Sequence, residues 1–148
     1  MLLRRKAAGY IRDVHGDLHT GNVFLYRDPV LFDCIEFNDD MRRIDILDEV
    51  AFLCMDLESY GRSDLSDQFY KDYVEFSGIP VTKDTDIVFR YFKLYRANIR
   101  AKVAMIVAQK GVEKKSNASA KSNVDRYIKL IRTYLADAYS SAKWRRAC

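Results

Sequence analysis

Glycine, histidine and cysteine are scarce in this chain of 148 residues, and each scarcity excludes a class of site. The six glycines never cluster; Gly16 and Gly21 have the spacing of a phosphate-binding P-loop, but the next two residues are Asn and Val, where that motif requires Lys and Ser or Thr. Two histidines are too few for a two-metal phosphoesterase site. Three cysteines without a C-x-x-C pair favour reduced thiols, and we therefore expect a cytoplasmic protein.

Long apolar runs are also missing. None approaches the roughly 20 residues that a membrane-spanning helix needs, and the opening MLLRRK is not followed by the apolar region of a signal peptide. We expect no membrane partner. The hydrophobic content of 49% is enough for a core, and the length is that of one domain.

Charge is distributed unevenly along the chain. Residues 13–67 contain 14 acidic and 4 basic side chains, whereas residues 68–148 contain 7 acidic and 17 basic ones. An excess of carboxylates in the acidic half is expected if they bind a divalent metal. The basic half either attracts an anionic partner or is a solvated helical face. Nucleic acid is not expected as a partner, because no recognised binding module is present.

The hydrophobic pattern predicts a mostly helical α+β chain. A short strand is expected over 11–14 and a hairpin of two apolar strands over 23–32. A mobile loop, rich in Ser, Lys and Asn, is expected over 111–123. Ser63 and Asp84 are the expected N-caps of two helices. The predicted helices cover residues 2–9, 44–60, 64–77, 85–110 and 124–142.

The most informative segment is residues 15–22, which read HGDLHTGN and precede the predicted hairpin and Asp33. A carboxylate, an amide five residues later and a second carboxylate beyond a hairpin are the groups with which kinases hold a metal-bound triphosphate and position a hydroxyl. Asp17 and Asn22 keep the offsets of the kinase pattern H-R-D-x-x-x-x-N. Gly16 replaces the Arg, and D-C-I replaces D-F-G. Asn22 and Asp33 flank the open mouth of the hairpin, so we expect them at the same end.

The flanking sequence extends this match. HGDLHTGN, LFDCIEFND from residue 31, RRID from residue 42 and AFLCMDLE from residue 51 together resemble the aminoglycoside phosphotransferase family, above all a bacterial subgroup. The strong resemblance covers roughly residues 11–60, and YFKLYRA at 91–97 is a weaker echo. It implies a protein-kinase-like C-terminal lobe. Residues 10–60 would hold the catalytic loop, hairpin and buried helix, and residues 61–148 a helical subdomain.

The resemblance also implies an activity: ATP- and Mg²⁺-dependent transfer of the γ-phosphate to the hydroxyl of a small molecule. Asp17 is the candidate general base, and His15 the residue that buttresses its loop. Asn22 and Asp33 are the candidate ligands of Mg²⁺ and, through the metal, of ATP, because Mg²⁺ prefers oxygen donors and takes one or two carboxylates plus substrate phosphates.

Several neighbouring residues have less certain roles. His19 is expected to be structural; a zinc site with His15 would need a helix, and the glycines favour a loop. Glu36 and Asn38 either approach the metal or acceptor, or lie on a surface loop.

Asp45 and Glu49 open the buried helix. The resembled family usually has Asp where Glu49 stands. If this carboxylate braces the catalytic loop, the additional methylene of Glu is expected to shift the contact. Further along the chain, Arg96 and Arg100 either meet an anionic group of the acceptor or belong to a solvated face.

The 14 residues ahead of His15 leave no room for the Gly-rich loop and Lys of a nucleotide lobe. We therefore expect a single partial domain over 1–148, inactive alone, whose nucleotide lobe is fused or separate. The alternative hypothesis is a non-catalytic kinase-lobe fragment that acts as a binding or structural module.

Overall fold

The computed structural model describes residues 1–110 and 114–144, with side chains for 1–109 and 122–140, and divides the chain into two compact units. The first unit covers Met1–Lys93 and the second begins at Leu94. The division falls inside helix α5 (Lys83–Lys110) and not at residue 60, where the sequence placed the start of a helical subdomain. The reason is that α4 and the first turns of α5 share a core with α3.

The first unit begins with helix α1 (Leu2–Ala7) and strand β1 (Ile11–Asp13), as the sequence predicted. Gly9, with φ at +77°, turns the chain between them. Strand β1 pairs antiparallel with β4 (Arg43–Asp45). The sequence predicted a helix from residue 44 instead, because this three-residue strand depends on a partner some thirty residues away in the chain.

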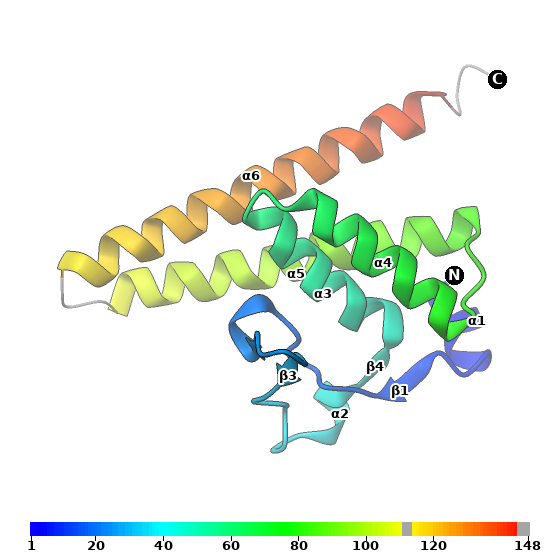
Figure 1. Cartoon of the computed structure of the whole chain (residues 1–148). Coiled ribbons are helices and arrows are strands. Elements are labelled where there is room, and N and C mark those ends of the chain that lie inside the picture. Colours follow the sequence, from blue (N-terminus) through cyan, green and yellow to red (C-terminus); the bar gives the residue numbers. More distant parts are fainter. Residues whose placement is uncertain (111–113, 145–148) are drawn as a thin grey trace. The chain divides into compact units, whose positions relative to one another are not determined.

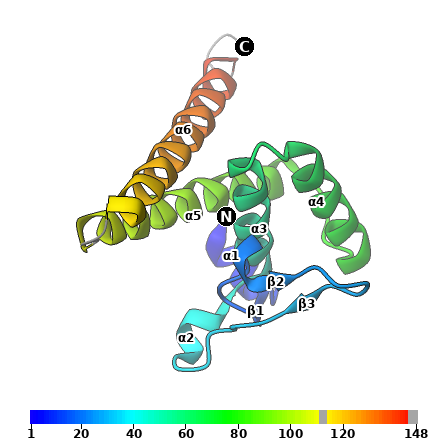
Figure 2. The same cartoon turned by 60° about the vertical axis from the view of Figure 1, so that its left-hand side comes forward.

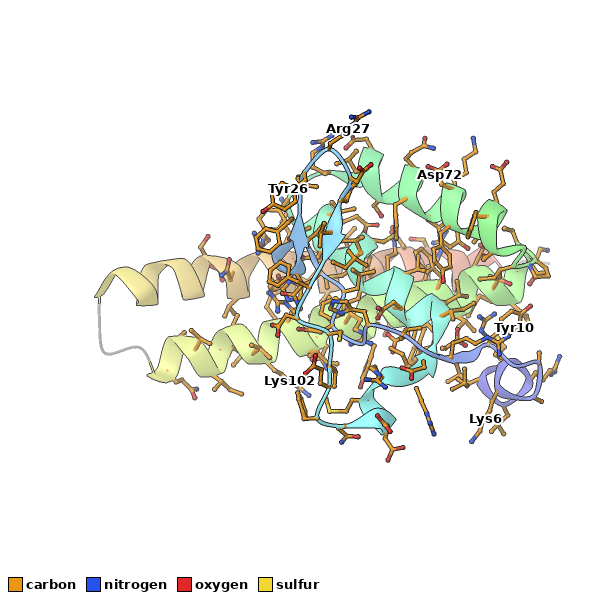
Figure 3. The ribbon with its side chains drawn as sticks, turned by 60° about the horizontal axis from the view of Figure 1, so that its bottom comes forward. Lys6, Tyr10, Tyr26, Arg27, Asp72 and Lys102 are labelled. Carbon is orange, nitrogen blue, oxygen red and sulfur yellow. The ribbon has the colours of Figure 1, made fainter. Side chains whose placement is uncertain are left out.

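The predicted hairpin is confirmed. Strand β2 (Val23–Phe24) pairs antiparallel with β3 (Val30–Leu31), and the two run side by side in Figure 2. A short 3₁₀ helix, η1 (Thr20–Asn22), leads into it. Tyr26 lies at the exposed tip (Figure 3). The hairpin therefore projects its turn outward and keeps its mouth at the end of η1.

Helix α3 (Ile46–Ser59) is the centre of the first unit, and α4 (Ser63–Ser77) packs against it (Figure 1). The predicted burial of α3 is confirmed, and its apolar side contributes to one cluster with α4 and the start of α5. Burial of apolar surface stabilises such a cluster by about 25 cal/mol per Å². The cluster comprises Leu47, Val50, Ala51, Cys54, Val74, Ile79, Val88, Phe89 and Phe92.

Two predicted helix caps are wrong. Ser63 is the first residue of α4, which Arg62 precedes without a capping side chain. At α5 the Thr82 hydroxyl accepts the hydrogen bond from the Thr85 N–H at 3.2 Å, whereas Asp84 lies within the first turn. Sequence alone does not separate these alternatives, because neighbouring Ser, Thr and Asp residues all favour the N-cap position.

The loop predicted over 111–123 is wrong for its larger part. Helix α6 (Lys114–Trp144) already includes residues 114–123, and residues 111–113 lie outside the described part of the chain. Ala and Lys have high helix propensity, and a helix nucleated by the amphipathic segment after residue 124 extends into them at little cost. Within the described residues no helix combines the length and the apolar character needed to cross a membrane.

A buried ion pair joins α1 to the start of α3. Arg5 donates to both carboxylate oxygens of Asp45, at 2.6 and 2.8 Å, and both side chains are buried. Asp45 also caps α3, because its Oδ1 accepts from the Leu47 N–H at 2.9 Å. One carboxylate therefore satisfies a buried guanidinium and an open helix end.

We expect Asp45→Ala to destabilise the chain strongly, because it leaves a buried cation without its carboxylate and removes a helix cap. A loss of about 3 kcal/mol or more in the free energy of unfolding is typical of such a change. Urea denaturation followed by circular dichroism measures it. Asp64→Ala is the control, since Asp64 pairs with Arg62 at the exposed start of α4; equal losses in both variants would contradict the prediction.

The thiols should differ in reactivity. Burial raises the pKa of Cys54 to about 12, so almost no thiolate is available at pH 8, whereas Cys34 is exposed. We expect iodoacetamide to alkylate Cys34 and spare Cys54 in the folded protein, as read by peptide mass spectrometry. In urea both should react. Fast alkylation of Cys54 without urea would show that this core is open.

Candidate functional site

The side chain of Asn22 bonds back to Asp17 across the loop. Asn22 Nδ2 donates to the Asp17 carbonyl oxygen at 3.0 Å and to its Oδ2 at 3.2 Å. Asn22 is buried, whereas 40% of the Asp17 side chain remains exposed. Because the amide nitrogen is used in this way, the carbonyl oxygen Oδ1 is the atom of Asn22 that can bind a cation. The structure therefore brings these two predicted site residues together.

His15 connects the loop to the strand that leads to Asp33. Its Nδ1 accepts from the Asp17 N–H at 3.3 Å, and its Nε2 lies 2.8 Å from the Phe32 carbonyl oxygen. An accepting Nδ1 requires the proton on Nε2, which then donates to Phe32. A backbone bond from Ile35 to the His15 carbonyl, at 3.0 Å, adds a second link. His15 is thus hydrogen-bonded both to the loop and to the residue before Asp33, and its buttressing role stays a prediction.

Asp33 has an unusual backbone conformation. Its φ is +61°, in the left-handed region, where Asp is among the few residue types found with any frequency. The backbone bond from Phe32 N to Asn22 O, at 3.1 Å, places it beyond the hairpin mouth, next to Asn22. Its carboxylate is exposed. Such strain is common at functional positions.

The bracing contact of Glu49 is present. Both of its carboxylate oxygens lie within hydrogen-bond distance of the Gly16 N–H, at 3.3 and 3.2 Å, and Glu49 is buried. The longer Glu side chain, from which a shift of this contact was expected, still reaches the loop, because Glu49 lies in the first turn of α3. Gly16 has φ at +85°, and a Cβ there would lie 3.0 Å from Ile35 Cδ1. Glycine therefore fits this position, where the kinase pattern has Arg.

A second buried carboxylate of α3 holds the far end of the loop. Asp56, 1% exposed, accepts from the Thr20 N–H at 3.0 Å and from the Thr20 hydroxyl at 2.6 Å. The sequence analysis gave Asp56 no role. A signal was present: Asp56 follows Glu49 by seven residues in a helix predicted to be buried, and both carboxylates therefore lie on one helix face.

His19 contacts both its own loop and helix α3. Its Nδ1 accepts from the Gly21 N–H at 3.0 Å, and its ring lies against Phe52, with centroids 5.5 Å apart. Its Nε2 is 3.6 Å from Asp17 Oδ2. With His15 bonded elsewhere, the two histidines do not form a pair of zinc ligands.

The remaining candidates are used in other ways. Asn38 caps helix α2 (Asp39–Arg42), accepting from the Asp40 N–H at 2.9 Å, and Glu36 is exposed. In the second unit, Arg96 is buried, and Arg100 donates to the Tyr127 hydroxyl at 3.3 Å. Arg96 therefore does not belong to a solvated face, whereas Arg100 is half-buried and its role stays a prediction.

The oxygens at the hairpin mouth fit Mg²⁺ in kind. Asn22 Oδ1 and the exposed Asp33 carboxylate are one amide and one carboxylate donor, which a Mg²⁺ site completes with water and substrate phosphates. The part of the chain that the structure describes contains no group of three or more His, Cys, Asp or Glu side chains arranged to hold a metal. A metal at this mouth would therefore take its remaining oxygens from water or from a bound ligand.

Comparison with known proteins gives relatives without an assigned function. Uncharacterized proteins of Mycobacterium bovis and of two strains of Mycobacterium tuberculosis are each 40% identical over 104 residues, which is 70% of this chain and 20% of the relative. The chain thus spans about a fifth of the length of the curated relatives it matches. The sequence matches no family model, and no solved structure matches the chain.

Substitution of Gly16 should destabilise the chain more than substitution of an uncrowded glycine with positive φ, because Gly16 is crowded. We expect Gly16→Ala to lower the free energy of unfolding by about 2–4 kcal/mol, from left-handed backbone strain plus overpacking against Ile35 and the Met41 carbonyl. Gly61→Ala is the matched control, because Gly61 has φ at +77° and nothing within 4 Å of the new Cβ; it should lose only about 1–2 kcal/mol. Equal losses in urea denaturation would show that the loop has room at Gly16.

Proposed function

We propose that this chain supplies the general base and the metal-binding groups of an ATP- and Mg²⁺-dependent phosphotransferase. The enzyme transfers the γ-phosphate to the hydroxyl of a small molecule and is related to the aminoglycoside phosphotransferases, with the chain as a kinase-like C-terminal lobe in the cytoplasm. Because the chain spans about a fifth of its relatives' length, the activity of the whole protein is part of this proposal, as is a fused or separate lobe that covers the nucleotide.

The observation that carries the proposal is the bond from Asn22 to Asp17. A kinase needs its base and its metal-binding amide in one fixed relation, because phosphoryl transfer depends on positioning and charge compensation more than on covalent chemistry. Asn22 Nδ2 bonds Asp17 on two oxygens. The amide thereby restricts the orientation of the carboxylate and leaves its own oxygen, Oδ1, as the atom proposed to bind the metal.

Asp17 is suited to the role of base. Its side chain is partly exposed, so an acceptor hydroxyl can approach it. The hydrogen bond from Asn22 and the nearby His19 ring restrict the rotation of this side chain. In this proposal one Asp17 oxygen accepts the hydroxyl proton as the acceptor oxygen bonds to the γ-phosphorus and the bond from that phosphorus to the bridging oxygen breaks, which releases ADP. Proton transfer by such a positioned group typically contributes 10²–10⁴-fold to a rate.

Asn22 and Asp33 are the groups that would hold the metal. When bound, Mg²⁺ neutralises charge on the phosphate oxygens and aligns the γ-phosphate with the acceptor. Asp33 contributes a full negative charge, and its left-handed backbone turns the chain immediately after the hairpin. His15 bonds to the carbonyl of the residue before Asp33, and so links the metal-binding carboxylate to the loop that carries the base.

Calorimetric titration of Mg·ATP into the chain tests the proposal. We expect binding that requires Mg²⁺ and is weakened at least about tenfold by Asp33→Ala, because the main carboxylate donor is lost. Asp28→Ala is the matched control: it removes an equally exposed Asp at the opposite end of the same hairpin.

The two variants decide between outcomes. Binding lost in Asp33→Ala and kept in Asp28→Ala supports a metal–nucleotide site at the hairpin mouth. Binding that both variants retain, or that persists in EDTA, would contradict it.

A further inference from the structure

Helix α3 presents three side chains to the loop that carries Asp17. Glu49 accepts from the Gly16 N–H, Phe52 lies against the His19 ring, and Asp56 accepts from Thr20. Residues at i, i+3 and i+7 lie on one face of a helix, and the first and last are about 10.5 Å apart along its axis. The loop from residue 16 to residue 20 is therefore laid along α3 and held at both ends by a carboxylate.

We infer that Asp56 is a positioning residue which, through Thr20, sets the place of Asn22 relative to Asp17. The importance of that place rests on the proposed function. Asp56 is a buried carboxylate bonded to Thr20, two residues before Asn22.

The contact between Asp56 and Thr20 is strong. A carboxylate that is 1% exposed is costly to bury unless it is hydrogen-bonded. Thr20 supplies two donors to the same oxygen, Oδ2, through its N–H at 3.0 Å and its hydroxyl at 2.6 Å. Bonds to an ionised acceptor are shorter and roughly twice as strong as neutral ones. Thr20 is therefore held at both its backbone and its side chain.

The path along the chain from Thr20 to Asn22 is short. Thr20 is the first residue of η1 and Asn22 is the last. The turn is closed by a bond from Asn22 N to the His19 carbonyl oxygen, at 2.9 Å. A single 3₁₀ turn has little freedom once its first residue and its closing bond are fixed. The position of Thr20 consequently determines where the Asn22 side chain begins.

Asn22 in turn connects the hairpin to the proposed base. Its backbone oxygen accepts from Phe32 N, and its side chain donates to Asp17. A shift of η1 by a fraction of an ångström would move the amide relative to both the base and the hairpin. Groups that orient metal ligands in this way typically change metal affinity by 10–100-fold when they are removed.

Manganese binding tests the inference without requiring catalysis or nucleotide. We expect Asp56→Asn to weaken Mn²⁺ binding to the 148-residue chain by about tenfold, as measured by water-proton relaxation. Thr20→Val removes only the hydroxyl donor and should weaken it less, which keeps the test open if Asp56→Asn fails to fold.

Glu58→Gln is the matched control. Glu58 is also a carboxylate of α3, and it accepts from Lys93 of α5 at 2.8 Å and from Ser66 of α4 at 2.7 Å. It should lower the melting temperature and leave Mn²⁺ affinity unchanged. A folded Asp56→Asn protein with wild-type Mn²⁺ affinity would overturn the inference and reduce Asp56 to a structural role.

Amide hydrogen exchange separates this inference from the proposed function. If the wild-type chain binds no Mn²⁺, the metal site fails, and the exchange rate of the Asn22 amide decides about Asp56. Exchange at least about tenfold faster in Asp56→Asn, but not in Glu58→Gln, would support positioning of the turn. An unchanged rate would overturn it.

Discussion

Buried carboxylates, one at the cap of α3 and two within it, are the constraint on which the rest of the first unit depends. Asp45, Glu49 and Asp56 are each at most 6% exposed, and a buried negative charge persists only where donors surround it. Their donors come from three different parts of the chain: Arg5 of α1, and the backbone at Gly16 and at Thr20. One helix therefore organises both the N-terminal segment and the polar loop.

This arrangement explains how a loop without regular structure can hold fixed geometry. The segment from residue 15 to residue 22 belongs to no strand, yet the N–H groups of Gly16 and Thr20 bond to side chains of a packed helix, and those of Asp17 and Gly21 bond to histidines of the segment itself. Loops held by a rigid scaffold are where binding and catalytic groups are usually found. Helix α3 fixes the position of the loop, and the loop and the hairpin carry the groups proposed to act.

The opposite end of the hairpin is built differently. Phe24 stacks on Phe32 with centroids 4.2 Å apart, but Leu25 and Tyr26 at the tip are largely exposed. The hairpin is thus ordered at its mouth, where His15 and Asn22 bond to its strands, and solvated at its turn (Figure 3). Only the mouth lies beside the groups proposed to act in phosphoryl transfer.

The sequence by itself determined the local features. Residue types and fixed offsets were enough to single out His15, Asp17, Asn22 and Asp33, and alternation and helical spacing were enough to predict the hairpin and α3. Such signals are local, because each depends on residues within one turn or one strand pair. The loop predicted over residues 111–123 is wrong for residues 114–123, because a polar composition does not prevent a helix from extending.

Only the tertiary structure decided which distant residues meet. The pairing of β1 with β4, the ion pair of Arg5 with Asp45 and the bonds from Thr20 to Asp56 join segments 30 to 40 residues apart in the chain. No local pattern encodes these contacts. They arise because a buried charge or an unpaired strand edge must find its partner wherever the folded chain brings one.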